Sequence, residues 1–137
     1  MLKKTITFIN FDGDKVTETH YFNLNKVELA RMQAKFGGGY SEFLKRIAEA
    51  KDPLAMLNVI TDLIESSYGI KEVDGKTFRK SKELTEAFVN SLAFESMFMD
   101  MVSGENANKN MVEFVKGILP ADMVDDNKVA EIMAENA

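Results

Sequence analysis

Few side chains in this sequence have the chemistry of a catalytic centre. The 137 residues include no cysteine and a single histidine, His20. Thiolate nucleophiles, thiolate zinc sites and disulfides are therefore excluded, and a Ser-His triad with a spare imidazole is hard to build. His20 lies in a threonine-rich segment beside Glu18 and Tyr21. A lone imidazole in that setting is more typical of a half-exposed strand residue than of a general base.

The segments that resemble ion-binding loops do not have the required spacing. Residues 10–14 (NFDGD) are rich in oxygen ligands, but an EF-hand requires glycine and glutamate where this sequence has Lys15 and Tyr21. This segment is typical of a hairpin turn. The three glycines at residues 37–39 lack the Lys-Ser/Thr ending of a phosphate-binding loop. We therefore expect neither a metal ion nor a cofactor, although carboxylate-only metal sites stay open.

The carboxylates do not form a catalytic pair at any recognisable spacing. Glu95 falls inside the apolar arc of a predicted helix, where an unpaired charge would be costly. It either meets a lysine or arginine from another element or marks an open stretch of that helix. Asp125 and Asp126 are adjacent and would point apart on a helix. No spacing brings a nucleophile, a base and an oxyanion donor together, so the sequence predicts a protein that is not an enzyme.

The charge balance disfavours nucleic acid and membranes as partners. The net charge is -5 and the pI is about 5.0, so the surface as a whole repels phosphate backbones. The local exception is a cluster of cations at residues 76–82, but neighbouring acidic residues make a solvated turn the more typical interpretation. No stretch approaches the roughly 20 apolar residues of a membrane span. We expect a soluble intracellular protein.

The strongest signal for binding is an apolar helix rich in phenylalanine and methionine. Residues 92–102 read LAFESMFMDMV. On a helical wheel the apolar positions from Leu84 to Val102 span roughly 220 degrees, against a stripe of about 100 degrees on an ordinary surface helix. Two interpretations fit: a central helix enclosed by neighbours, or an adaptable partner surface. For the second, the candidate partner-binding residues are Phe94, Met97, Phe98, Met99 and Met101.

The elements that would position this helix begin with a β-hairpin at residues 2–22. Residues 2–9 and 16–22 are rich in β-branched and aromatic residues, and Asp12-Gly13-Asp14 supplies the turn between them. A hairpin alone is marginally stable in water. Its apolar face must therefore pack on the helices that follow.

Four to five helices are predicted over residues 25–119. Asn25 and Glu28 form a capping box at the first, and the glycines at 37–39 end it. Further starts are expected at Ser41, at Asp52 followed by proline, at Ser81 and at about residue 107. The helix from Asp52 should end at Gly69, and one long helix should run from Ser81 to Gly104. Two short strands are expected around Asp74-Gly75.

These elements predict one α+β, mainly helical domain. An N-terminal antiparallel β-hairpin should pack on a bundle of four to five helices within residues 1–120. Residues 121–137 should form an acidic C-terminal tail with a short mobile helix at most.

Five segments, in this order and at this spacing, resemble the tail assembly chaperones of long-tailed bacteriophages. They are residues 21–29 (YFNLNKVEL), 38–47 (GGYSEFLKRI), 67–70 (SYGI), 74–81 (DGKTFRKS) and 114–120 (FVKGILP). The resemblance implies a non-catalytic protein in the cytoplasm of the bacterial host cell. It would bind the hydrophobic helical tape measure protein, or other tail proteins, until the tail tube forms. No residue motif of the family transfers to single positions here.

Two other interpretations remain open. The chain could be a structural tail or head-completion protein that stays in the virion. It could also be a small protein-binding adaptor that offers the edge strand from Thr5 to Ile9 for strand addition. A homo-oligomer is compatible with each of them, and the sequence does not fix the oligomeric state.

Overall fold

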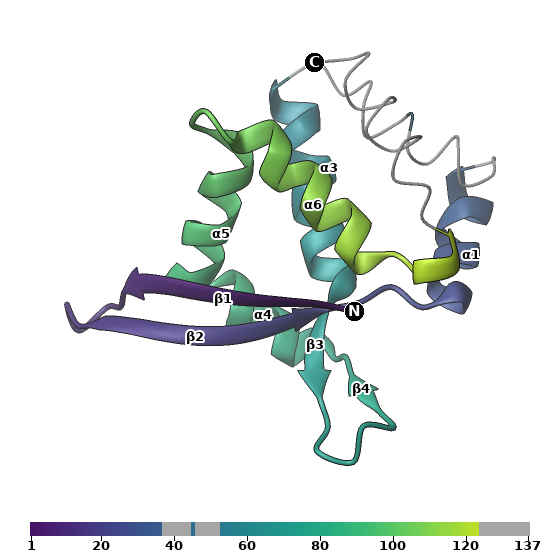
Figure 1. Ribbon diagram of the computed structural model, residues 1–137, viewed down its shortest axis with the longest axis horizontal. Coiled ribbons are helices and arrows are strands. Elements are labelled where there is room, and N and C mark those ends of the chain that lie inside the picture. The colour runs from purple at the N-terminus through teal and green to yellow at the C-terminus, as the bar shows by residue number, and fades with distance from the viewer. Residues whose placement is uncertain (37–44, 46–52, 124–137) are drawn as a thin grey trace.

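A β-sheet covered on one face by helices makes up the structure (Figure 1). The computed structural model describes residues 1–36, 45 and 53–123 of the chain. Within these ranges the fold is α+β and mainly helical, with an N-terminal antiparallel hairpin packed on helices, as the sequence predicted. The glycines at 37–39, the helix expected after Ser41 and the N-cap expected at Asp52 lie outside the described residues.

Strands β1 (Leu2–Ile9) and β2 (Lys15–Phe22) form the hairpin, and its two faces differ. On the inner face Ile6 is buried against the helices. The outer face is exposed and carries threonines whose hydroxyl groups meet across the strands. The pairs are Thr5 with Thr19 at 3.3 Å and Thr7 with Thr17 at 2.9 Å. The alternation of strand side chains therefore gives one core face and one polar face.

The acidic segment between these strands is a hairpin turn, as predicted. The side-chain oxygen of Asn10 accepts hydrogen bonds from the backbone N–H groups of Asp12 and Asp14, at 3.0 and 2.9 Å. Gly13 has a φ of +82°, a left-handed conformation that glycine adopts without strain.

Strands β3 (Tyr68–Lys71) and β4 (Phe78–Arg79) extend the hairpin into a four-stranded sheet of order β1-β2-β3-β4. Two short strands around Asp74-Gly75 were expected. The sequence did not predict that these strands pair with the N-terminal hairpin. In the pairing, Tyr68 of β3 lies opposite Phe22 of β2. The pairing joins residues far apart in sequence, so no local pattern marks it.

The prediction that Gly69 ends a helix was wrong. Helix α3 (Pro53–Ser67) stops earlier, and Gly69 already lies in β3. A Cβ atom at this position would lie 2.6 Å from the ring of Phe78 and 2.8 Å from the carbonyl oxygen of Arg79. Glycine is required here because the neighbouring strand and its phenylalanine ring approach too closely for any side chain.

Helix α1 (Lys26–Phe36) begins with the predicted capping box. The backbone N–H of Glu28 donates to the side-chain oxygen of Asn25 at 2.8 Å, and the carboxylate of Glu28 accepts from the N–H of Asn25 at 3.0 Å. The leucines on either side of the cap, Leu24 and Leu29, are both buried. Local sequence therefore determines where this helix starts.

Helix α3 contributes Ile60, Leu63 and Ile64 to the core. Leu57, one turn before Ile60 on the same helix, is 36 % exposed. Among the α3 side chains that the structure describes, the buried ones thus lie between Ile60 and Ser67.

The long helix predicted from Ser81 to Gly104 is instead two helices, α4 (Lys82–Val89) and α5 (Leu92–Val102). Ser91 has extended backbone angles, φ -96° and ψ 158°, and its hydroxyl accepts from the N–H of Phe94 at 3.3 Å. Serine and asparagine compete for backbone hydrogen bonds and favour helix ends. The pair Asn90-Ser91 therefore ends one helix and caps the next.

Helix α6 (Ala107–Ile118) follows the predicted range closely and is followed by a short 3-10 turn, η1 (Ala121–Met123). In η1, Asp122 pairs with Lys26 of α1, and this hydrogen bond holds the pKa of the Asp122 carboxyl below its usual range. The boundary proposed at residue 120 remains a prediction. The buried face of α6 is apolar, as expected, and includes Met111, Val115 and Ile118.

The core lies between the inner face of the sheet and the helices, and Phe22 is at its centre. Its side chain is fully buried. Its ring lies 5.7 Å from that of Tyr68, 5.6 Å from that of Phe88 and 5.6 Å from that of Phe114. One strand residue therefore connects β3, α4 and α6, and edge-to-face contacts of this kind add to the burial of the rings.

Candidate functional site

Helix α5 packs on the core with one narrow stripe of side chains. Ala93, Met97 and Met101 recur every four residues and are 0 %, 1 % and 1 % exposed. The helix contacts α3, α4, α6 and β1. This spacing places the three side chains on one face, so the core needs only a part of the perimeter of α5.

The five candidate partner-binding residues divide between two environments. Met97 and Met101 lie inside the core. Phe94 and Phe98 are partly buried against it, and Met99 is 47 % exposed. We call Phe94, Phe98 and Met99 the outer stripe, because their side chains retain surface that another molecule can reach.

The two phenylalanines of the outer stripe are held in place by aromatic contacts that continue into the core. The rings of Phe94 and Phe98 lie 5.5 Å apart, and Phe94 meets Phe88 edge-on at 5.9 Å. Phe88 in turn contacts Phe22 at 5.6 Å. Side chains fixed in this way lose little conformational freedom on binding, which lowers the entropic cost of an interface.

Carboxylates border the outer stripe. Glu95 was expected inside the apolar arc, but it is exposed and lies in the first turn of α5. Of the two alternatives for Glu95, the open stretch of helix is therefore the one observed. Its predicted position inside the apolar arc was wrong, because residues 84–102 were placed on one wheel and the break at Asn90-Ser91 gives α5 a rotation of its own. A carboxylate in the first turn is favourable at the positive end of the helix dipole. Asp100 is also exposed, so the charged residues of α5 are all acidic.

His20 packs on aromatic rings of the core. Its side chain is 17 % exposed, and its ring lies 4.8 Å from that of Phe88 and 5.8 Å from that of Tyr68. Its Nε2 atom lies 3.0 Å from a carboxylate oxygen of Glu18. Burial raises the pKa of the Tyr68 hydroxyl, and the negative charge of Glu18 raises it further. These contacts place His20 as a packing residue between sheet and α4.

The cation cluster at residues 76–82 is partly used within the fold. The ammonium group of Lys80 donates to the Glu28 carboxylate at 2.6 Å and to the carbonyl oxygens of Asn23 and Ser66 at 2.6 and 2.8 Å. Arg79 pairs with Glu72 at 2.7 Å. Two of the four cations, Arg79 and Lys80, are therefore engaged within the fold, and the turn interpretation of the cluster stays a prediction.

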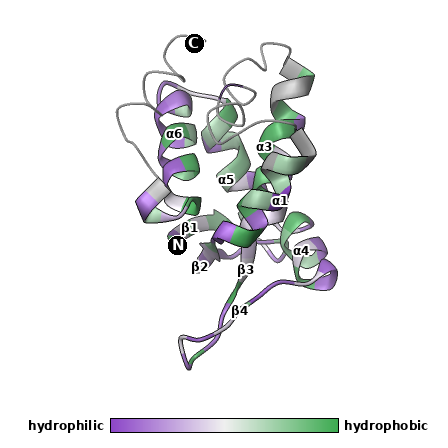
Figure 2. Ribbon diagram, turned by 90° about the vertical axis from the view of Figure 1, so that its right-hand side faces the viewer, coloured by the Kyte–Doolittle hydropathy of each residue, from purple (hydrophilic) through white to green (hydrophobic). Residues whose placement is uncertain are grey.

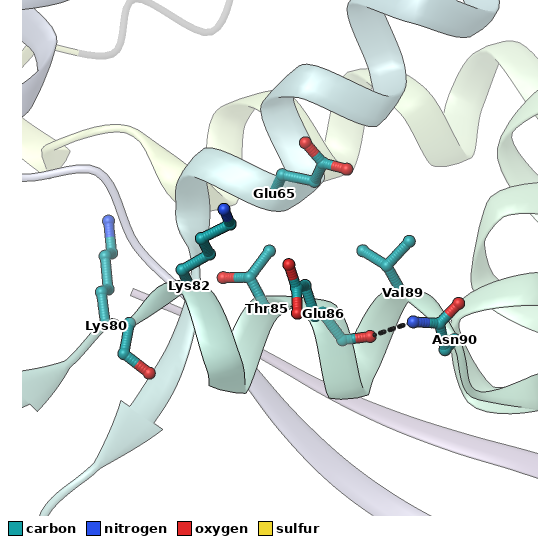
Figure 3. A pocket seen from close by; sticks show the side chains of 8 residues that line it. Glu65, Lys80, Lys82, Thr85, Glu86, Val89 and Asn90 are labelled. Atoms are coloured by element: carbon teal, nitrogen blue, oxygen red, sulfur yellow. Dashed lines mark hydrogen bonds between the residues drawn. The ribbon is translucent and has the colours of Figure 1, made fainter.

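A groove of about 530 Å³ lies between the C-terminal part of α3 and α4. No pattern in the sequence predicts this groove. Figure 3 shows Glu65 of α3 facing Lys82, Thr85 and Glu86 of α4 across this space. The lining mixes both signs of charge with Val89.

Residues 1–36, 45 and 53–123 hold neither a candidate metal site nor a candidate membrane span. Among those residues there is no group of three or more histidine, aspartate or glutamate side chains that could hold a metal ion. In the same part of the chain, none of the helices is both long enough and apolar enough to span a bilayer.

Comparison with known proteins gives one match. Residues 1–137 fit the sequence model of a family described as phage tail assembly chaperone. The comparisons with curated proteins and with solved structures produced no match. The family model covers the whole chain, including helix α5, which carries the outer stripe.

Proposed function

This chain belongs to the phage tail assembly chaperone family, and we propose that it acts without catalysis by binding the tape measure protein while the tail is assembled. The tape measure protein is a long, largely apolar helix that needs cover until tube subunits enclose it. The chaperone would bind that helix through the outer stripe of α5 and release it as the tube polymerises.

The observation that carries this proposal is the difference between the two sides of α5. Met97 and Met101 complete the core, while Met99 is 47 % exposed beside the partly buried Phe98. Figure 2 shows the hydrophobic character of α5. Methionine and phenylalanine can adapt to helices of varied sequence, since the methionine side chain is flexible and polarizable.

The charges around the outer stripe select the kind of helix that fits it. Glu95 and Asp100 are exposed on α5, which carries no cationic residue. A partner helix with an apolar face bordered by lysine or arginine would meet opposite charges at the rim. Such rim charges steer association more than they strengthen it, which suits a complex that must later dissociate.

The test is co-purification of a tagged tape measure fragment with the chaperone. Phe98→Ser combined with Met99→Ser should reduce the captured chaperone at least tenfold, because both substitutions remove apolar contact area from the proposed interface. Val73→Ser is the matched control, since Val73 is fully exposed on the β3–β4 hairpin and also loses apolar surface. It should bind as the unmodified protein does.

The fold must be intact for this comparison to count. Far-ultraviolet circular dichroism should be alike for both variants, and urea unfolding should show that both are folded under the conditions of the capture experiment. Equal capture of the double variant and the control would remove α5 from the interface.

Mass spectrometry of purified virions separates a chaperone from a structural component. We expect the chain to be missing from finished particles. Its presence at a fixed ratio to the tube protein would overturn the chaperone proposal and favour a retained tail or head-completion protein.

A further inference from the structure

Strand β1 has a strand neighbour on one side only in the described part of the chain, because the sheet order is β1-β2-β3-β4. In an antiparallel pair, successive residues direct their backbone groups to opposite sides. The N–H of Asn10 donates to the carbonyl oxygen of Asp14 at 2.9 Å, which fixes the even-numbered residues of β1 as those bonded to β2. Outward-directed backbone groups therefore belong to Lys3, Thr5, Thr7 and Ile9.

Apart from two lysines at its start, this edge lacks the usual features that prevent strand addition. The eight residues of β1 (LKKTITFI) contain no proline and pair with β2 in an unbroken register, without a bulge. The lysines are confined to its first half, so no charged residue follows Lys4 within the strand. An edge of this length and regularity is a template for another strand.

The charges at the two ends of β1 are opposite and favour one orientation of the incoming strand. Lys3 and Lys4 lie at its start, and Asp12 and Asp14 lie in the exposed turn that follows its end. An antiparallel second copy brings the lysines of each chain beside the acidic turn of the other. A parallel copy would place like charges together.

We propose that two copies of this chain pair through their β1 edges in antiparallel orientation, which joins the two sheets into one. Only the odd-numbered residues of β1 can form backbone hydrogen bonds to the second copy. In the register in which all four of them do so, Thr5 lies opposite Thr7 of the second copy. Lys3 then lies opposite Ile9 of the second copy, and the two Ile6 residues meet at the two-fold axis. This interface is isologous, so it closes as a dimer and does not grow into a filament.

Exposed side chains on the outer face support this register. Met1, Ile9 and Phe11 are 54 %, 55 % and 80 % exposed and all occupy odd-numbered positions. In the proposed dimer Phe11 becomes a neighbour of Met1 of the second copy. The threonine pairs between Thr5 and Thr19 and between Thr7 and Thr17 continue across the axis into a wider row.

The first test is the molar mass of the full chain by light scattering after size exclusion, over a range of concentrations. We expect a dimer that dissociates on dilution. Thr7→Pro removes a backbone N–H that points away from β2, so it breaks a hydrogen bond to the second copy and none between β1 and β2. This variant should therefore be a monomer. Thr17→Pro is the matched control, because Thr17 lies directly opposite Thr7 and directs its N–H away from β1. It should remain a dimer.

The second test fixes the register through disulfide formation, which is free of background because the chain has no cysteine. A Thr5→Cys protein mixed with an isotope-labelled Thr7→Cys protein should give mainly the mixed disulfide. Hydrogen-bonded strand partners lie about 5.5 Å apart between Cα atoms, within disulfide reach. The like-with-like pairs are diagonal, at about 7–8 Å, and should form less.

A monomeric unmodified chain at every concentration would overturn the proposal, as would a dimer that Thr7→Pro leaves unchanged. If both proline variants were monomeric, the disulfide experiment would decide, and absence of the mixed product would reject the β1 interface. The tests need no tail protein, so they fail or succeed independently of tape measure binding.

Discussion

The two sides of α5 carry the same kinds of residue and end in different environments. Met97 and Met99 are two positions apart, yet Met97 is 1 % exposed and Met99 is 47 % exposed. Ala93, Met97 and Met101 fill space in the core, where α5 contacts β1 and α6. The outer stripe keeps part of its surface accessible. Residue type alone therefore does not assign a methionine to core or interface. The neighbours that a helix meets make that assignment.

The largest expected effect contrasts these two methionines. Met97→Ala should lower the free energy of unfolding by about 2–5 kcal/mol, because it leaves a cavity in a packed core. Met99→Ala should change it by no more than about 0.5 kcal/mol, as is usual at an exposed site. Urea unfolding of both variants measures the difference. Similar losses would mean that the outer stripe is also structural, and the proposed partner surface would have to be abandoned.

A second contrast compares two neighbouring cations. Lys80→Met should destabilise by about 1–3 kcal/mol, because the Glu28 carboxylate and two carbonyl oxygens lose their donor in a partly buried site. Arg79→Met breaks a more exposed pair with Glu72 and should cost at most about 0.5 kcal/mol. Chemical denaturation of both variants gives the comparison. If Arg79→Met lowered the free energy of unfolding as much as Lys80→Met, the difference in burial between the two ion pairs would not explain their contributions to stability.

The smallest effect concerns two tyrosines at high pH. The pKa of Tyr68 is raised by burial and by Glu18, so above its ordinary value of 10.0 the unfolded chain loses the hydroxyl proton first. Stability from this group is complete below pH 10 and falls as pH rises through the higher folded pKa. Tyr68→Phe should make that decline shallower in urea titrations between about pH 9 and 11. Tyr21→Phe, on the other face of the sheet, is measured alongside as the control for removal of a tyrosine hydroxyl group.

Features set by near neighbours in sequence were predicted correctly. Asn25 and Glu28 cap α1 as expected, and Asn10 with Gly13 forms the turn between β1 and β2. The range of α6 was also close to that expected. In each case the hydrogen bonds that define the feature join residues within about four positions.

Features that depend on distant residues were missed. Tyr68 was expected near a helix end, yet it pairs with Phe22 across the sheet. Gly69 was interpreted as a helix terminator, although the ring of Phe78 is what requires glycine there. The break at Asn90-Ser91 had a local signal, but the unbroken run of apolar residues around it outweighed that signal. The error then misplaced Glu95.

The sequence by itself determined the α+β class, the hairpin and the caps of the helices, because short-range hydrogen bonds and apolar periodicity specify these features. It also carried the resemblance that the family match confirms. Only the tertiary structure decided that Met97 and Met101 belong to the core and that Phe94, Phe98 and Met99 keep accessible surface. Burial is a property of what packs against a side chain, and α5 is covered partly by strand β1 and helix α3, which are distant from it in sequence.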